Sequence, residues 1–94
     1  MAISDTLKAI SDPVRRQILE LLRKQSYAAG EIASQFELKP ATVSYHLKLL
    51  KEAGLITERK DKNFIYYDLN ASVFEEVLSW IYSLKMGGEH DEQK

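Results

Sequence analysis

The chain has 94 residues, which is enough for one domain and too few for two. Its residues are 45% hydrophobic and 29% charged, a mixture typical of a folded globular domain rather than a disordered chain. There is no Cys, which excludes disulfides, thiolate metal ligands and a cysteine nucleophile. The first residues show no basic region followed by an apolar run, so we expect no secretory signal and a cytoplasmic location.

Charge is unevenly distributed along the chain, although the net charge is only −1. Residues 39–69 carry six basic and four acidic side chains, whereas residues 70–94 carry two basic and five acidic ones. A basic surface can bind a polyanion while the whole protein stays nearly neutral. The asymmetry amounts to a few charges, so it indicates a function only together with a local motif.

Apolar residues at helical spacing predict two helices near the N-terminus. The first is a short helix within residues 3–10. Asp12 is a good N-cap and Pro13 suits the first helical position, so a second helix is expected from there to about Lys24.

Two arginines, Arg15 and Arg16, occupy the first turn of this second helix. The helix dipole disfavours cations at that end. We therefore expect at least one of the two to pair with a carboxylate, which would be a packing role.

The next segment predicts a helix-turn-helix. Residues 26–36 form a short third helix, in which Gly30 costs about 1 kcal/mol relative to Ala and so indicates close packing. Residues 37–39 are a tight turn. Pro40 then opens a fourth helix, which Gly54 ends as a C-cap.

Two β-prone runs, residues 55–60 and 64–69, predict a hairpin around residues 61–63. A last helix is expected over residues 71–86, ended by two glycines, with residues 87–94 as a disordered polar tail. The expected fold is mainly α with one β-hairpin, a winged helix-turn-helix domain. Its elements follow in the order helix, helix, short helix, helix, hairpin, helix.

The fourth helix has a small, hydroxyl-rich face opposite its apolar stripe, which contains Val43, Leu47 and Leu50. Small side chains let a helix approach the major groove closely, and hydroxyls can bond to bases or phosphates. The amides at the helix start attract phosphate as well. The candidate DNA-binding residues of this segment are Lys39, Ala41, Thr42, Ser44, Tyr45 and Lys48.

Each of these residues also has an ordinary structural interpretation. Ser and Thr near a helix start are often local caps, and Tyr45 could simply cover the surface. The DNA-binding hypothesis therefore depends on the whole set. His46 falls off the outward face, so we interpret it as a packed, hydrogen-bonded histidine rather than a base-reading residue or a metal ligand.

The hairpin tip carries four further candidate DNA-binding residues, Arg59, Lys60, Lys62 and Asn63. Such a tip can bind phosphates or enter the minor groove. The alternative is a solvated turn, whose charge Asp61 dilutes. We favour DNA contact because the hairpin directly follows the fourth helix.

Four segments resemble the arsenical-resistance-repressor (ArsR/SmtB) family of small bacterial winged-helix repressors. They are residues 9–19, 29–33, 40–50 and 54–56 within a match over residues 7–86, and Pro-Ala-Thr-Val-Ser-Tyr-His-Leu-Lys-Leu-Leu at 40–50 is the most specific. Residues 63–70 are most similar to the autorepressor branch exemplified by the sporulation-delaying-system repressor (SdpR). The resemblance implies a homodimer that binds a partly palindromic operator and represses transcription, often of its own operon.

The chain departs from the metal-sensing members of this family. Those members carry two cysteines near the start of the recognition helix, or Asp and His pairs on the last helix. Here there is no Cys, the histidines are His46 and His90, and the adjacent Glu75 and Glu76 point in different directions on a helix. A transition-metal site needs about three or four converging ligands. We therefore expect no metal sensing and no cofactor.

The last helix is broadly apolar, with eight apolar residues among the twelve from Val73 to Leu84. This is wider than the buried stripe of a surface helix. We expect a second chain to cover it, although the hairpin and the second helix are the alternative cover. The expected dimer surface is Ile3, Leu7, Phe74, Val77, Leu78, Trp80, Ile81 and Leu84.

The expected function is sequence-specific repression of transcription by a homodimer on an inverted-repeat operator. The alternative is a winged helix that binds only proteins, but its exposed helix face should be more apolar. An enzyme is not expected, because the sequence shows no nucleophile–base pair, phosphate-binding glycine loop or converging carboxylates. The expected partners are double-stranded DNA and a second copy of the chain. Two alternatives stay open for induction: a membrane protein that sequesters the repressor, or no inducer at all.

Overall fold

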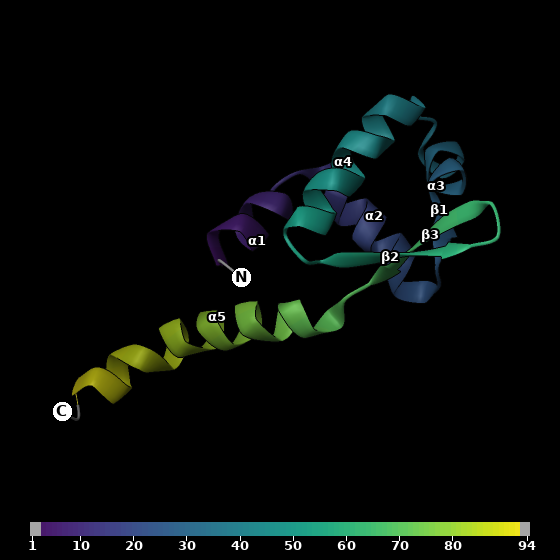
Figure 1. The fold of residues 1–94 in the computed structure, drawn as a ribbon. Coiled ribbons are helices and arrows are strands. Elements are labelled where there is room, and N and C mark those ends of the chain that lie inside the picture. Colours follow the sequence, from purple (N-terminus) through teal and green to yellow (C-terminus); the bar gives the residue numbers. More distant parts are fainter. Residues whose placement is uncertain (1–2, 93–94) are drawn as a thin grey trace.

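The computed structural model describes residues 3–92, and the side chains of residues 3–86. Within that range, helices surround a small antiparallel sheet whose strand order is β1-β3-β2 (Figure 1). The predicted winged helix-turn-helix is confirmed. The elements are α1 (Ile3–Ala9), α2 (Pro13–Lys24), β1 (Tyr27–Ala28), α3 (Ala29–Phe36), α4 (Pro40–Glu52), β2 (Ile56–Asp61), β3 (Phe64–Leu69) and α5 (Ala71–Glu92).

The core lies where α2, α3 and α4 meet the start of β2. Ile18, Ile32, Leu50 and Leu55 are fully buried there. Each such side chain contributes roughly 1.5–3 kcal/mol relative to exposure in water. The apolar stripes predicted from the sequence therefore hold α4 against the body of the domain.

Helix α2 starts as predicted, but its arginines have different partners. The Asp12 carboxylate accepts a hydrogen bond of 3.0 Å from the Arg15 backbone N–H. Arg15 Nε donates to the Ala9 carbonyl and Arg16 Nη1 to the Ile10 carbonyl, both at 2.7 Å. The predicted carboxylate partners were wrong, because carbonyls left unpaired at a helix end also attract cations.

A short strand replaces the predicted start of the third helix. Tyr27 and Ala28 pair with β3, so α3 begins at Ala29 rather than at Ser26. The Glu31 side chain accepts a bond of 2.8 Å from the Ala28 N–H and so caps α3. Gly30 is exposed, with no atom within 4 Å of the place a Cβ would occupy, so the expected close packing there is wrong.

The predicted hairpin is confirmed. Asp61 pairs with Phe64, which leaves Lys62 and Asn63 as a two-residue turn. Lys62 has a φ of 59°, a left-handed conformation that such tight turns require. The hairpin therefore projects Lys62 and Asn63 at its tip.

Helix α5 extends away from the rest of the domain as an arm (Figure 1), and the molecule spans 56 Å along its longest axis. The backbone is helical to Glu92, beyond the predicted end at Met86 and through part of the expected tail. A glycine weakens a helix by about 1 kcal/mol without forbidding it. Residues 93–94 lie outside the described part. No helix of residues 3–92 has both the length and the apolar character needed to span a bilayer.

The Asp12 cap gives a stability prediction. We expect Asp12→Ala to lower the free energy of unfolding by about 1 kcal/mol at pH 7. The Arg15 N–H holds the pKa of Asp12 below its ordinary 3.8, so this stabilisation is present above that pH and is lost as pH falls through the lowered pKa. Asp12→Asn keeps an acceptor and should retain most of the stability at pH 7. Urea unfolding at pH 7 and pH 3 measures both effects; equal stability of the wild type and Asp12→Ala at pH 7 would contradict the prediction.

Candidate nucleic-acid interface

Helix α4 divides cleanly into a buried and an exposed side. Its apolar stripe lies in the core, and Lys39 just before the helix is exposed. The predicted outward residues are all exposed, and we call this set the outer face: Ala41, Thr42, Ser44, Tyr45 and Lys48. Small and hydroxyl-bearing side chains therefore lie near the start of an accessible helix.

Tyr45 and His46 are neighbours with opposite environments. Tyr45 is 58% exposed, whereas His46 is 9% exposed, and their ring centroids lie 5.7 Å apart. Arg15 Nη1 lies 3.2 Å from His46 Nδ1. The prediction of a packed, hydrogen-bonded histidine is confirmed.

A polar contact joins the end of α4 to the hairpin. The Lys51 ammonium donates to the Glu58 carboxylate of β2, which raises the pKa of Lys51 and lowers the pKa of Glu58. Burial raises the pKa of the nearby Tyr67 phenol. These three residues line a groove together with Ser44, Leu47 and Lys48. Two residues of the outer face, Ser44 and Lys48, thus share a groove with the hairpin.

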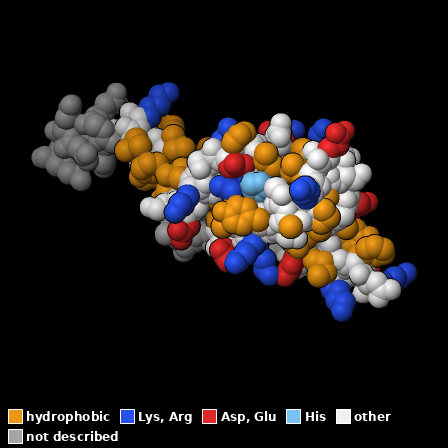
Figure 2. Space-filling model, turned by 90° about the horizontal axis from the view of Figure 1, so that it is seen from above, with side chains coloured by type: hydrophobic (Ala, Val, Ile, Leu, Met, Phe, Trp, Pro, Cys, Tyr) orange, Lys and Arg blue, Asp and Glu red, His pale blue; other side chains and the backbone are white. Residues whose placement is uncertain are grey.

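The hairpin tip presents cations together with apolar side chains. Lys60, Lys62 and Asn63 are exposed, as predicted. Phe64 and Ile65 are also exposed, although sequence reasoning left them out of the candidate surface. In Figure 2 blue and orange side chains meet at the hairpin end of the molecule. Their exposure follows from the length of the strands, which reach beyond the core.

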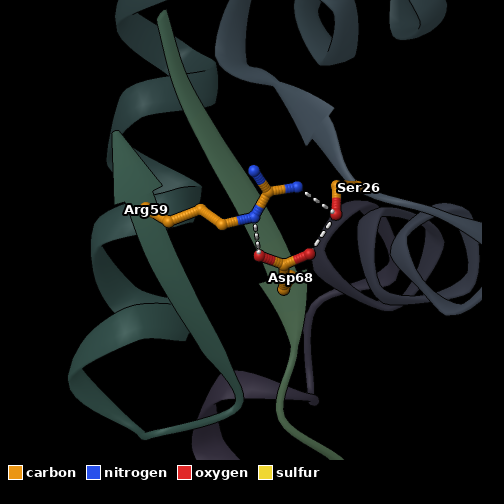
Figure 3. A network of polar contacts seen from close by, with 3 residues as sticks. All are labelled: Ser26, Arg59 and Asp68. Atoms are coloured by element: carbon orange, nitrogen blue, oxygen red, sulfur yellow. Dashed lines mark hydrogen bonds and ion pairs between the residues drawn. The ribbon is translucent and has the colours of Figure 1, made fainter. Parts of the chain in front are cut away.

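Arg59 belongs to a polar network rather than standing free (Figure 3). Its Nε donates to Asp68 at 3.0 Å and its Nη2 to Ser26 at 3.1 Å, while Ser26 also donates to Asp68. Its guanidinium carbon lies 5.3 Å from the centre of the Tyr66 ring. These partners of Arg59 were not predicted from the sequence. The signal is the strand register, which makes Arg59 and Asp68 diagonal neighbours on one face.

The apolar surface of α5 is largely exposed in the single chain. Figure 2 shows orange side chains gathered on the arm beside the grey atoms. The predicted dimer residues Leu78, Trp80, Ile81 and Leu84 are exposed there. Tyr82 and Met86, which the prediction omitted, are exposed as well.

The other predicted dimer residues are less accessible. Val77 is only 5% exposed, so it packs within its own chain and its assignment to the dimer surface is wrong. Phe74 is half-buried against the core. Ile3 and Leu7 of α1 are also half-buried. The first two turns of α5, which carry Phe74 and Val77, therefore pack on their own chain, and α5 also contacts α1.

Potential metal ligands do not gather among the described side chains, where no three His, Cys, Asp or Glu residues could hold one ion. His46 is directed at Arg15. The side chain of His90 lies outside the described residues.

Comparison with known proteins places this geometry in a family. Residues 12–58 match the model of the bacterial regulatory protein arsR family. The transcriptional repressor SdpR of Bacillus subtilis (strain 168) is 38% identical over 89 residues, covering 95% of this chain and 99% of that protein.

Two solved structures share the fold at clear sequence identity. A possible transcriptional regulator for arsenical resistance has a TM-score of 0.77 and 32% identity, covering 85% of this chain and 83% of that one. A homodimeric winged helix-turn-helix DNA-binding domain from Mycobacterium bovis, a possible ArsR-family regulator, has a TM-score of 0.74 and 26% identity, covering 89% and 79%.

The matched residues include α2, α3, the turn, all of α4 and the start of β2, which are the elements that build the outer face. Identity with a curated repressor extends over nearly the whole chain. The family and its members are transcriptional regulators rather than enzymes. The chain belongs to the arsR family of bacterial regulatory proteins and is a winged-helix transcriptional regulator.

Proposed function

We propose that this protein is a cytoplasmic repressor that binds, as a homodimer, an inverted-repeat operator upstream of its own operon. The observation that carries the proposal is the open outer face of α4 beside a hairpin with exposed cations. A helix with this profile fits the major groove, and exposed lysines at a hairpin tip fit the adjoining backbone or minor groove. The similarity to repressors supports the same conclusion.

The exposed residues divide by chemistry into two roles. Thr42, Ser44 and Tyr45 offer hydroxyls and a ring to base edges, and Ala41 allows close approach. The lysines Lys39, Lys48, Lys60 and Lys62 offer charges to phosphates, and the amide of Asn63 can donate beside them. Arg59 is held by Asp68 and Ser26, so we assign it a smaller share of phosphate binding. The polar character of the outer face disfavours a module that binds only proteins.

A second copy of the chain is proposed to cover the exposed apolar surface of α5. Leu78 is 63% exposed, and it lies in the arm that projects from the domain. Exposed apolar surface of this kind marks an interaction site. A homodimer among the structural neighbours supports this assignment. Two outer faces would then lie about 34 Å apart, which matches successive turns of one duplex face.

We propose that repression does not depend on a metal ion. The chain has no Cys. The described residues also bring no set of three ligand side chains together.

Binding to the DNA upstream of the protein's own coding region tests the proposal. We expect specific binding that exceeds binding to a scrambled duplex by at least about 10³-fold and weakens steeply with salt. Fluorescence anisotropy at two salt concentrations measures both affinities. One equivalent of Zn²⁺ should leave them unchanged. Equal affinity for the two duplexes would contradict sequence-specific repression, and loss of binding with Zn²⁺ at a preserved fold would contradict metal independence.

Single substitutions distinguish the residues that contact phosphates from those that contact base edges. We expect Lys62→Ala to weaken binding to both duplexes alike, because a phosphate contact is lost. The slope of the logarithm of the binding constant against the logarithm of salt concentration, the salt slope, should fall by about one for each lysine removed. Lys85→Ala, on the α5 arm, removes the same charge and should change neither. Tyr45→Ala should reduce operator affinity and spare the scrambled duplex. A uniform loss from Tyr45→Ala would show that Tyr45 does not read bases.

A negative charge introduced into the apolar surface of α5 tests the proposed dimer surface. We expect Leu78→Glu to convert a dimer at micromolar concentration into a monomer of unchanged helicity, because Leu78 is exposed within its own chain. Glu75→Gln, at an exposed polar position of the same helix, should remain dimeric. Light scattering on sizing chromatography reports the mass. A wild-type monomer, or a dimeric Leu78→Glu variant, would contradict the assigned surface.

A further inference from the structure

We propose that Arg15 is a positioning residue that fixes the orientation of the DNA-reading helix α4 relative to α1. The proposal rests on the proposed function of α4, and it assigns to Arg15 a role in operator discrimination. It stands on the contacts of one buried guanidinium group with groups from two other helices.

The Arg15 side chain starts on α2 and is only 8% exposed. Its Nε donates to the Ala9 carbonyl at 2.7 Å and its Nη2 to the Lys8 carbonyl at 3.3 Å, both at the end of α1. Its Nη1 contacts His46 Nδ1 of α4 at 3.2 Å. Each guanidinium nitrogen therefore has a partner, and one side chain links three helices.

The chemistry of the contact defines the state of His46. A guanidinium group donates hydrogen bonds and cannot accept them. Nδ1 of His46 must therefore be the acceptor, which places the ring proton of the neutral imidazole on Nε2. The contact is thus a directional hydrogen bond between a buried cation and a specific ring nitrogen, and it depends on how α4 is oriented.

The position of His46 connects this bond to the outer face. His46 directly follows Tyr45, and the two rings lie 5.7 Å apart. Arg15 and Tyr45 also line one cleft between α1 and α4, together with Asp5, Lys8, Leu49 and Glu52. A rotation of α4 that breaks the Arg15 bond would move Tyr45 along that cleft. Contacts with base edges depend on the exact position of Tyr45, whereas flexible lysine side chains can still reach phosphates after a small displacement of α4.

Arg16 provides an internal comparison. It is the next residue on α2, and its Nη1 donates to the Ile10 carbonyl at 2.7 Å, just past the end of α1. Arg16 is exposed, and its guanidinium bonds to the segment that follows α1 rather than to α4. A change at Arg16 therefore disturbs the same helix end and the same type of bond, but leaves the link to His46 intact.

The test compares operator and scrambled-duplex affinities of four full-length single variants and one double variant by fluorescence anisotropy. Arg15→Lys keeps the charge, but a single ammonium lacks the planar fork that serves Lys8, Ala9 and His46 at once. His46→Asn retains an acceptor near the place of Nδ1, and His46→Leu removes it. Arg16→Lys is the matched control. Thermal unfolding of each variant shows that it is folded at the temperature of the assay.

We expect Arg15→Lys and His46→Leu each to lower the operator-to-scrambled ratio by about tenfold, with scrambled-duplex affinity and salt slope unchanged. His46→Asn and Arg16→Lys should keep the wild-type ratio. The Arg15→Lys/His46→Leu double variant should lose no more than one single variant, because both remove the same interaction. Additive losses, or a loss of ratio in Arg16→Lys equal to that in Arg15→Lys, would overturn the proposal.

A measurement without DNA separates this proposal from the proposed function. Long-range ¹H–¹⁵N spectra of the wild-type protein report which nitrogen of His46 carries the proton. We expect an unprotonated Nδ1. Its ¹⁵N chemical shift should change in Arg15→Lys and stay the same in Arg16→Lys. A protonated Nδ1 would overturn the positioning role of Arg15 even if the protein binds the operator. If the spectrum is as expected but the protein shows no preference for the operator, only the proposed function is overturned. If Arg15→Lys does not fold, the His46→Asn and His46→Leu comparison decides.

Discussion

The functional surface depends on the division of α4 into an apolar side, which is buried in the core, and a polar side, which is exposed to solvent. Val43, Leu47 and Leu50 are removed from water in the core, and this fixes which way the remaining residues point. The opposite side, the outer face, is rich in polar side chains and is exposed to solvent. The hydrophobic effect therefore holds a hydroxyl-rich helix face in solvent on a rigid support.

Polar contacts at both flanks refine this placement. Arg15 joins His46 to the end of α1, and Lys51 joins the end of α4 to Glu58 of the hairpin. Exposed ion pairs such as Lys51–Glu58 contribute little to stability, whereas a buried guanidinium requires its partners. The two contacts therefore differ in energetic importance: the buried one specifies the orientation of α4, and the exposed one adds little to the packing of the hairpin on the helix.

The sequence predicts those parts of the fold that follow from local rules. Asp12 and Pro13 mark the start of α2, and the apolar spacing of α4 identifies its outer face, as the structure confirms. The sequence does not reveal contacts that depend on strand register or on helix ends brought together in space. Examples are the strand at Tyr27, the Ser26–Asp68–Arg59 network and the carbonyl partners of Arg15. The extension of α5 through Gly87 opposes local propensity, which is why it was missed.

In the proposed function, a dimer presents two outer faces to one side of a common duplex. The absence of native Cys lets a single Ser44→Cys substitution carry one nitroxide label per chain, on an exposed position of α4. Electron–electron double resonance then measures the distance between the two labels in the free dimer. We predict a distribution centred near about 34 Å, one helical turn of DNA. A dimer whose labels lie twice as far apart, or show no dipolar coupling, would contradict it.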